Sequence, residues 1–431
     1  MSSRSATQTA FAPGADDLKL AHFGSRLIAM GGRRSTRVGA LMFILLFVAY
    51  HFTAFQLSKV WPLAPTHDMG IIYRASMGAL ADGVYPNEIF PYAPSALLLF
   101  GVLTLGGPVA FVLVWYGLML AGLATSLRGG LAGESFAFRA AWPILGVIAL
   151  AVGGGAIASD LRNPNCNIIY LGLAMGGYAL LGRWPRFAGV LIGMSVSMKL
   201  YSGLLPVWLL LNGHKRAFIG ALVATVFLWV VAPAAIFGVD GLERLYAGWR
   251  EQLRMVSDPA IHTMYFEMSG GPGIVTLQRA IVAATGGHFG SPETLAWLYA
   301  LWIVWIATLA WYAWRWRNAF PVAAPSRGAL ADWVVMLLAP LPFSPWLEPY
   351  HMVPILIGAL FCSLVALDVR VARTERVAAL GALAIVLVFR IIYVPFPVRG
   401  FGLFAQLTAL VLAIGFIRPS LAPARRSPIE A

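Results

Sequence analysis

Long apolar runs, separated by short clusters of basic residues, recur along the whole chain. About 20 apolar residues cross the hydrocarbon core of a bilayer as a helix. The runs that reach or approach this length are 38–58, 108–127, 138–158, 216–237, 294–314, 328–343, 350–368, 377–394 and 401–417. Only 11% of the residues are charged and 59% are apolar, whereas a soluble domain carries about a quarter charged residues. The sequence therefore predicts an all-α polytopic membrane protein with about ten to twelve transmembrane helices.

The basic residues set the orientation of the chain. If the basic clusters are cytoplasmic, that side holds 21 of the 31 Lys and Arg but 7 of the 18 Asp and Glu, a net charge of +14 against −1 outside. This bias obeys the positive-inside rule and argues against nucleic-acid binding, despite the net charge of +13. We therefore expect cytoplasmic tails over 1–37 and 418–431, one transmembrane domain over 38–417, and extracytoplasmic loops over 59–92 and 238–293.

This orientation implies that two apolar segments do not cross the bilayer completely. Run 38–58 leaves the cytoplasm and Arg128 is back inside, so only one further crossing is available. Run 108–127 supplies it, and we expect 93–106 to be a half-helix in the outer leaflet. Segment 187–212 starts and ends beside cytoplasmic basic residues, so it enters and returns, with Lys199 at its turning point. Irregular backbone at that depth requires a lining of protein or water, so a cavity in the outer leaflet is predicted.

The first outer loop carries the best candidate for acid–base chemistry. His67-Asp68 follows the first span and precedes a helical pattern. Asp68 is either an N-cap or a general base that takes a proton from an alcohol, and the two interpretations are compatible. Tyr85 and Tyr92 lie in proline-rich stretches of the same loop, where they either stack on a sugar ring or belong to the interfacial aromatic belt. The second loop contributes His262 as a further candidate.

Several cations are candidates for binding an anion. Lys199 stands in an apolar run, where a cation is either a phosphate ligand or a snorkelling side chain. Arg390, near the outer end of its span, is a weaker candidate of the same kind. Arg162, beside Asn165 and Asn167, either binds phosphate or faces water.

The turn over 344–351 holds Glu348 and His351 between two spans, as an active-site wall or an interfacial turn. No phosphate-binding glycine loop, dinucleotide fingerprint or Cys/His metal pattern is present, and the two cysteines form no framework. The sequence therefore predicts no metal and no cofactor. An enzyme of this kind needs a donor already activated within the membrane.

Five sequence motifs occur in a fixed order along the chain and can be compared with those of known families. H-D-M-G-I-I-Y-R-A-S-M-G-A-L-A-D-G-V-Y opens the first loop, and Y-A-P follows before an apolar helix. N-P-N-C-N-I-I-Y-L-G-L, G-R-W-P-R-F-A-G-V-L-I-G-M-S-V-S-M-K-L-Y-S-G-L-L-P and S-P-W-L-E-P-Y-H come later, in that order. Over roughly 60–215 and 340–352, the chain resembles the membrane glycosyltransferases of the C superfamily, most closely family 87.

The resemblance implies a mannosyltransferase-like enzyme that moves a hexose from a polyprenyl-phosphate donor to a lipid or glycan acceptor, with inversion. It implies Asp68 as the general base and Lys199 as the residue that neutralises the donor phosphate. The expected location is a bacterial inner membrane, with the active site extracytoplasmic. The rival class is a transporter or flippase for a lipid-linked or anionic solute. Such proteins often carry paired broken helices, and the sequence shows one such segment, at 187–212.

Overall fold

The computed structural model describes residues 24–56, 68–86, 92–257, 281–282, 284–287, 291–315, 325–343, 349–391 and 399–421. The regular structure in this part of the chain is helical throughout, which confirms the all-α class. Its α-helices are α2 (Arg34–Gln56), α3 (Asp68–Asp82), α4 (Pro94–Thr104), α5 (Gly107–Gly129), α6 (Phe136–Ala140), α7 (Trp142–Arg162), α8 (Asn167–Leu180), α9 (Pro185–Met198), α10 (Leu204–Leu211), α11 (Lys215–Val226), α12 (Ala232–Ser257), α15 (Pro292–Arg315), α16 (Arg327–Leu338), α17 (Ile355–Leu367), α18 (Arg373–Ile391) and α19 (Arg399–Ile417). The short helical segments between or after them are η1 (Leu200–Gly203), η2 (Phe227–Val231), η3 (Leu341–Phe343), η4 (Pro349–Met352) and η5 (Arg418–Leu421).

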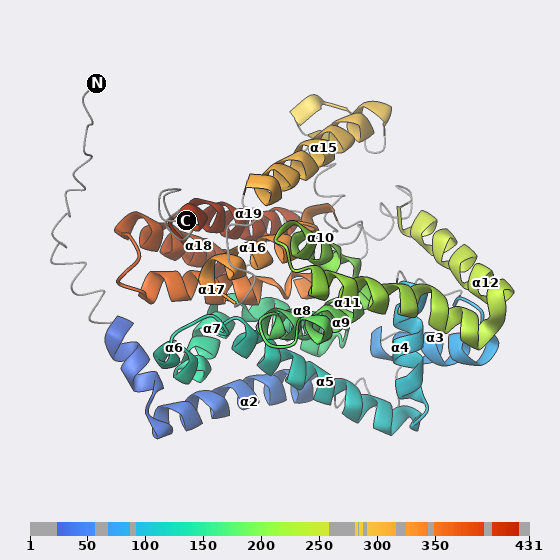
Figure 1. The fold of residues 1–431 in the computed structure, drawn as a ribbon, viewed down its shortest axis with the longest axis horizontal. Coiled ribbons are helices and arrows are strands. Elements are labelled where there is room, and N and C mark those ends of the chain that lie inside the picture. Colours follow the sequence, from blue (N-terminus) through green and yellow to red (C-terminus); the bar gives the residue numbers. More distant parts are fainter. Residues whose placement is uncertain are drawn as a thin grey trace.

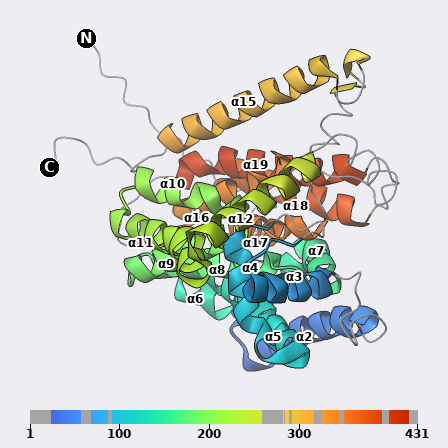
Figure 2. The ribbon, with the colours of Figure 1, turned by 90° about the vertical axis from the view of Figure 1, so that its right-hand side faces the viewer.

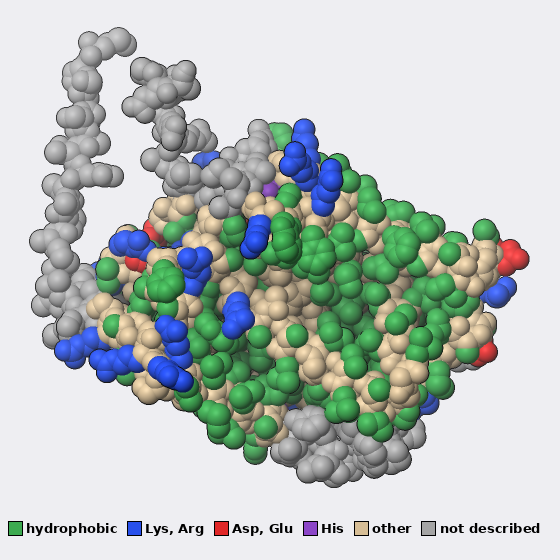
Figure 3. All heavy atoms as spheres, turned by 60° about the horizontal axis from the view of Figure 1, so that its bottom comes forward, with side chains coloured by type: hydrophobic (Ala, Val, Ile, Leu, Met, Phe, Trp, Pro, Cys, Tyr) green, Lys and Arg blue, Asp and Glu red, His purple; other side chains and the backbone are tan. Residues whose placement is uncertain are grey.

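The outer surface is that of a membrane protein. Within the described residues, four helices are long and apolar enough to cross a bilayer, over Gly107–Gly129, Trp142–Arg162, Lys215–Met255 and Pro292–Tyr312. Hydrophobic side chains cover most of the face in Figure 3, and Lys and Arg gather toward its left edge and its top. Large apolar residues such as Leu113, at 69% exposure, point outward from these helices. In a soluble protein such an extended apolar surface would aggregate; here it faces lipid.

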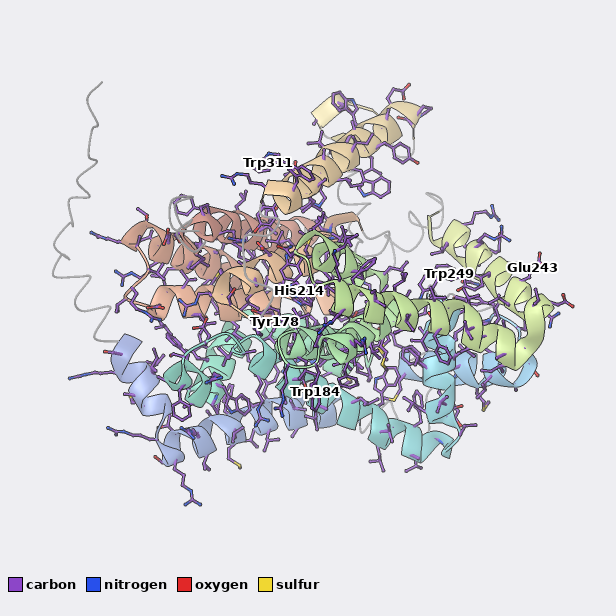
Figure 4. The ribbon with its side chains drawn as sticks, in the orientation of Figure 1. Tyr178, Trp184, His214, Glu243, Trp249 and Trp311 are labelled. Carbon is purple, nitrogen blue, oxygen red and sulfur yellow. The ribbon has the colours of Figure 1, made fainter. Side chains whose placement is uncertain are left out.

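Helix α7 lies inside the bundle, with α2 on one side and α17 on the other, and α8 packs between α5 and α9. Helix α15 stands apart from the other helices in both views (Figures 1 and 2). Polar contacts with α16 and its end connect it to the bundle: Tyr312 donates to Asp332 at 2.9 Å and the Trp305 indole donates to the Ala339 carbonyl at 2.8 Å. The Trp311 side chain of α15 is 63% exposed, consistent with its place at the edge of the molecule (Figure 4).

Glycine allows the closest helix crossings. A Cβ at Gly189 in α9 would overlap the Ala217 carbonyl of α11, and one at Gly220 would overlap the Arg186 carbonyl. Between α5 and α8, a Cβ at Gly122 would come within 2.6 Å of the Ile168 carbonyl oxygen. Helices in lipid associate through van der Waals contact rather than through the hydrophobic effect, so small residues at a seam let backbones approach. These seams hold α9 against α11 and α8 against α5, and α9 leads into the segment that carries Lys199.

The predicted interruptions are present. Helix α4 has 11 residues and is separate from α5, so 93–106 does form a short helix of its own. Segment 187–212 is broken at Lys199, where the backbone is extended (φ −145°, ψ 124°) between α9 and η1. The arms α9 and α10 have 14 and 8 residues, about 21 and 12 Å long at 1.5 Å per residue, and both are shorter than a ~30 Å hydrocarbon core.

Both predicted outer loops contain helical structure: the helix expected after Asp68 is present, whereas the helix in the second loop was not predicted. Helix α3 begins at Asp68 in the first loop. In the second, the chain turns at Gly238 (φ 72°) and continues as an amphipathic helix to Ser257. Its buried face carries Leu245, Trp249 and Gln252. The apolar positions recur at helical spacing, which is a helix signal even where charged residues lie between them.

An ionic network lies near the N-terminal end of α7, whereas Arg162 lies at its C-terminal end. Arg327 binds Glu134 through two nitrogens, at 2.7 and 2.5 Å, and Asp368 through a third at 2.7 Å. Arg370 also binds Asp368, at 2.8 and 2.9 Å. Burial opposes ionisation of Asp368, yet hydrogen bonds from Arg370 and Arg327 hold its pKa well below the usual value. The network joins the ends of α5 and α17 to the start of α16.

Candidate active site

Five segments far apart in the sequence meet where Asp68, Tyr92, Asn165, Lys199 and His351 come together. They are the start of α3, the residues before α4, the α7–α8 turn, the break after α9, and η4. Asp68 and Lys199 are half-buried, whereas Tyr92, Asn165 and His351 are buried. The two charged groups therefore keep partial access to a molecule outside, while neutral groups hold them in place.

Asp68 is linked to Tyr92 through the amide of Asn165. Asn165 Nδ2 lies 3.4 Å from Asp68 Oδ2, and the Tyr92 hydroxyl donates to Asn165 Oδ1. The backbone N–H of Cys166 donates to the same Oδ1 at 2.8 Å. Two donors on one atom identify it as the oxygen of the amide, so the NH₂ group faces the carboxylate. The amide of Asn165 therefore fixes one side of the Asp68 carboxylate.

The hydroxyls of Tyr85 and Tyr92 act as donors here. Burial raises the pKa of both phenols well above the usual value, so both stay protonated. Tyr85 donates to the Tyr92 carbonyl at 2.5 Å, which braces the chain just before α4. Tyr85 packs in turn against Gly248 of α12, where any side chain would strike its Cβ. The amphipathic part of α12 thus backs the first loop, and Figure 1 places it beside α3 and α4.

The break that carries Lys199 is stabilised by three serines. The Lys199 N–H still donates to the Ser195 carbonyl at 3.0 Å, as the last bond of α9. The hydroxyls of Ser195 and Ser202 meet at 2.6 Å across the break, and Ser195 Oγ also lies 2.9 Å from the Tyr170 carbonyl. Ser95, three residues after Tyr92, donates to the Ser197 carbonyl at 2.9 Å. This last bond fixes the segment of Tyr92 against the segment of Lys199.

The ammonium of Lys199 lies among neutral rings. Its Nζ is 3.5 Å from His351 Nε2, 4.3 Å from the centre of the Tyr92 ring and 5.8 Å from that of Tyr201. Within the part of the chain that the structure describes, no carboxylate forms an ion pair with it. A cation in such a place is stabilised by ring faces and can take an anion as a further partner. Among the same residues, no cluster of three or more His, Cys, Asp or Glu side chains could hold a metal ion.

The other predicted site residues fall in different places. Arg162 is exposed at the end of α7 and donates from Nε to Nδ1 of His51 in α2, at 3.1 Å. Asn167 is fully buried and donates to Asp160 at 2.8 Å, behind the site rather than in its wall. Three candidates lie outside the described residues, namely His67, His262 and Glu348. Arg390 belongs to α18, but its side chain is also outside the description.

Two residues near the site escaped the sequence analysis. Tyr201 stacks edge-on against His351, with ring centres 5.7 Å apart, and lies two residues after Lys199. Asp160 is fully buried near the end of α7. Its signal was present, because an acid inside an apolar run marks a functional position by default. No comparable signal distinguishes Tyr201 from the other aromatic residues of the apolar runs.

A comparison with known protein families identifies the family of the chain. The family model for glycosyltransferase family 87 matches residues 90–345, more than half of the chain. The chain belongs to glycosyltransferase family 87. It is therefore a membrane glycosyltransferase, and this membership decides against the transporter alternative. No curated protein and no solved structure matches the chain. In this family 87 protein, the matched range includes Tyr92, Asn165 and Lys199 and leaves out Asp68 and His351. The roles of all five residues rest on geometry.

Proposed function

We propose that this glycosyltransferase moves a hexose, mannose-like, from a polyprenyl-phosphate donor to a hydroxyl of a lipid or glycan acceptor. The reaction inverts the configuration at the anomeric carbon and takes place on the extracytoplasmic face of a bacterial inner membrane. The Lys and Arg excess of the tails and basic clusters places these segments in the cytoplasm under the positive-inside rule, which supports an active site on the other face of the membrane. The proposal is carried by one observation: Lys199, without a carboxylate ion pair among the described residues, stands next to the side chains that hold Asp68.

Lys199 fits the phosphate of the donor. An ammonium is a compact point charge with three N–H donors, and His351 occupies one of them in the structure. A phosphate that enters beside Tyr92 and Tyr201 would take the others. As the bond from the anomeric carbon to the phosphate oxygen breaks, its electron pair goes to that oxygen. Negative charge therefore grows next to Lys199, and a cation held there in advance stabilises the transition state more than the ground state.

Asp68 fits the general base. The acceptor hydroxyl attacks the anomeric carbon from the face opposite the phosphate, a new carbon–oxygen bond forms, and the hydroxyl proton passes to the Asp68 carboxylate. Asn165 holds one carboxylate oxygen at 3.4 Å, and in the proposed reaction the carboxylate turns its accepting lone pairs toward the acceptor hydroxyl. The position of Asp68 in the first turn of α3 fixes the direction of its side chain further. A single displacement needs no covalent intermediate, so one carboxylate acting as a base is enough.

Purified protein in detergent or liposomes tests the proposal directly. Polyprenyl phosphate carrying radiolabelled mannose is supplied with a lipid extract of the source cells. We expect label in a new lipid product, and mass spectrometry should find the same product absent from membranes that lack the protein. Failure to transfer label from polyprenyl phosphate, together with transfer from a nucleotide sugar, would overturn the assignment of the donor.

A further inference from the structure

Asp160 is a fully buried acid behind the proposed site. It stands in the last turn of α7 and its side chain is fully buried. Its two oxygens have separate donors in the first turn of α8: Asn167 Nδ2 at 2.8 Å from Oδ1, and the backbone N–H of Ile168 at 2.9 Å from Oδ2. A buried carboxylate is expensive unless it is hydrogen-bonded, and the start of a helix is where negative charge is best tolerated. Asp160 thus fastens the end of α7 to the start of α8.

The turn that Asp160 closes carries Asn165. Residues 163–166 connect the two helices, and the structure has no helix of its own there. Within the turn, the Cys166 N–H holds Asn165 Oδ1. The direction of the Asn165 amide, toward Tyr92 on one side and Asp68 on the other, therefore depends on how the turn is anchored. Its two ends are anchored by Asp160.

We propose that Asp160 is a positioning residue for sugar transfer: through Asn167 and Ile168 it sets the turn that aims Asn165 at the Asp68 carboxylate. The inference rests on the proposed function, in which Asp68 is the base. Asp160 itself touches neither Asp68 nor Lys199 among the contacts above. A purely structural anchor would lower the stability of the protein without changing the relation of Asn165 to Asp68, and the experiment is designed to separate these two roles.

The exchange of the two partners supplies the first test. Asn167→Asp alone places two carboxylates against each other, whereas the double variant Asp160→Asn/Asn167→Asp restores one carboxylate and one amide in exchanged places. With polyprenyl phosphate mannose as donor, we expect Asn167→Asp to lower kcat about 100-fold, the effect of a misplacement of about 1 Å, with an almost unchanged KM for the donor. The double variant should return kcat to within about tenfold of the native value. No recovery in a well-folded double variant would overturn the inference.

A measurement that needs no activity separates this inference from the proposed function. In a background in which Cys166 and Cys362 are replaced by Ala, Asp68→Cys and Asn165→Cys form a pair for a short bifunctional thiol reagent. We expect rapid cross-linking in this background and a rate about tenfold lower when Asp160→Ala is added. The thermal unfolding midpoints with and without Asp160→Ala should be similar, which shows that both proteins are folded. Equal rates with and without Asp160→Ala would overturn the positioning role even if sugar transfer is confirmed. A reduced rate would support it even if the donor proves to be different.

Discussion

Lys199 Nζ lies 3.5 Å from Nε2 of His351, a residue 152 positions later in the chain. A lysine ammonium only donates, so His351 accepts at Nε2 and its ring is neutral. The pair joins the break after α9 to η4 and aims the cation without cancelling its charge. In the proposed function, this arrangement leaves the Lys199 cation available to the donor phosphate.

Replacing Lys199 by Ala should weaken the binding of polyprenyl phosphate about 10- to 100-fold, because a hydrogen bond to a charged group contributes about 1.5–3 kcal/mol. Quenching of tryptophan fluorescence on titration with polyprenyl phosphate in detergent measures the change. The matched control is Lys215→Ala, at an exposed position at the start of α11, which should bind as the native protein does. Equal binding by the native protein and Lys199→Ala would return Lys199 to the role of a snorkelling side chain.

Replacing Asp68 by Asn should lower kcat by about 10²–10⁴-fold, the usual contribution of a general base, because an amide cannot take the proton of the acceptor. The affinity for polyprenyl phosphate should stay within about twofold, since Lys199 is untouched. Asp82→Asn is the control, because Asp82 is an exposed acid at the other end of the same helix. Turnover that survives Asp68→Asn would remove Asp68 from the mechanism.

The sequence predicted those parts of the fold that depend on local composition. The apolar runs and the break at Lys199 follow from hydropathy and charge, and α4 and the Lys199 break lie where charge parity required short segments. The part of α12 after Gly238 was not predicted, because the segment was classified as a loop from its number of charged residues. Its apolar residues Leu245 and Trp249 nevertheless lie at helical spacing.

The candidate site was predicted residue by residue but not as an assembly. Asp68, Tyr92, Asn165, Lys199 and His351 all stood among the candidates, since a polar group in or beside an apolar run is informative by itself. That Tyr92 lies between the carboxylate and the cation is a property of helix packing, which local patterns do not encode. The same holds for Arg162: its neighbour Asn165 faces Asp68, whereas Arg162 turns to His51 on another helix.

The close crossing of α9 and α11 predicts a sharp difference between two glycines. Gly189→Ala should destabilise the protein by about 1–3 kcal/mol, because the new methyl group would overlap the Ala217 carbonyl. Gly117→Ala in α5 is the matched control, since nothing lies within 4 Å of a Cβ there, and alanine favours a helix over glycine by about 1 kcal/mol. Thermal unfolding in detergent should show a lower midpoint for the first and an equal or higher one for the second. Equal midpoints would contradict the tight seam.

Tyr92 has two functions that two substitutions separate. Tyr92→Phe keeps the ring under Lys199 but removes the hydroxyl that donates to Asn165. We expect kcat to fall about tenfold, as for the loss of one hydrogen bond of about 1–1.5 kcal/mol, with unchanged affinity for polyprenyl phosphate. Tyr92→Leu removes the ring as well, and the affinity should then fall a further two- to fivefold, which matches about 0.5–1 kcal/mol for a cation–π contact.

The matched control for both variants is Tyr299→Phe, on the exposed face of α15, which should leave kcat and affinity at native values. Both quantities come from the same preparations, so a folding defect would lower them together. If Tyr92→Phe lost affinity to the same extent as Tyr92→Leu, the hydroxyl rather than the ring would hold the cation. Such a result would contradict the arrangement in which the Tyr92 hydroxyl contacts Asn165 and the Tyr92 ring contacts Lys199.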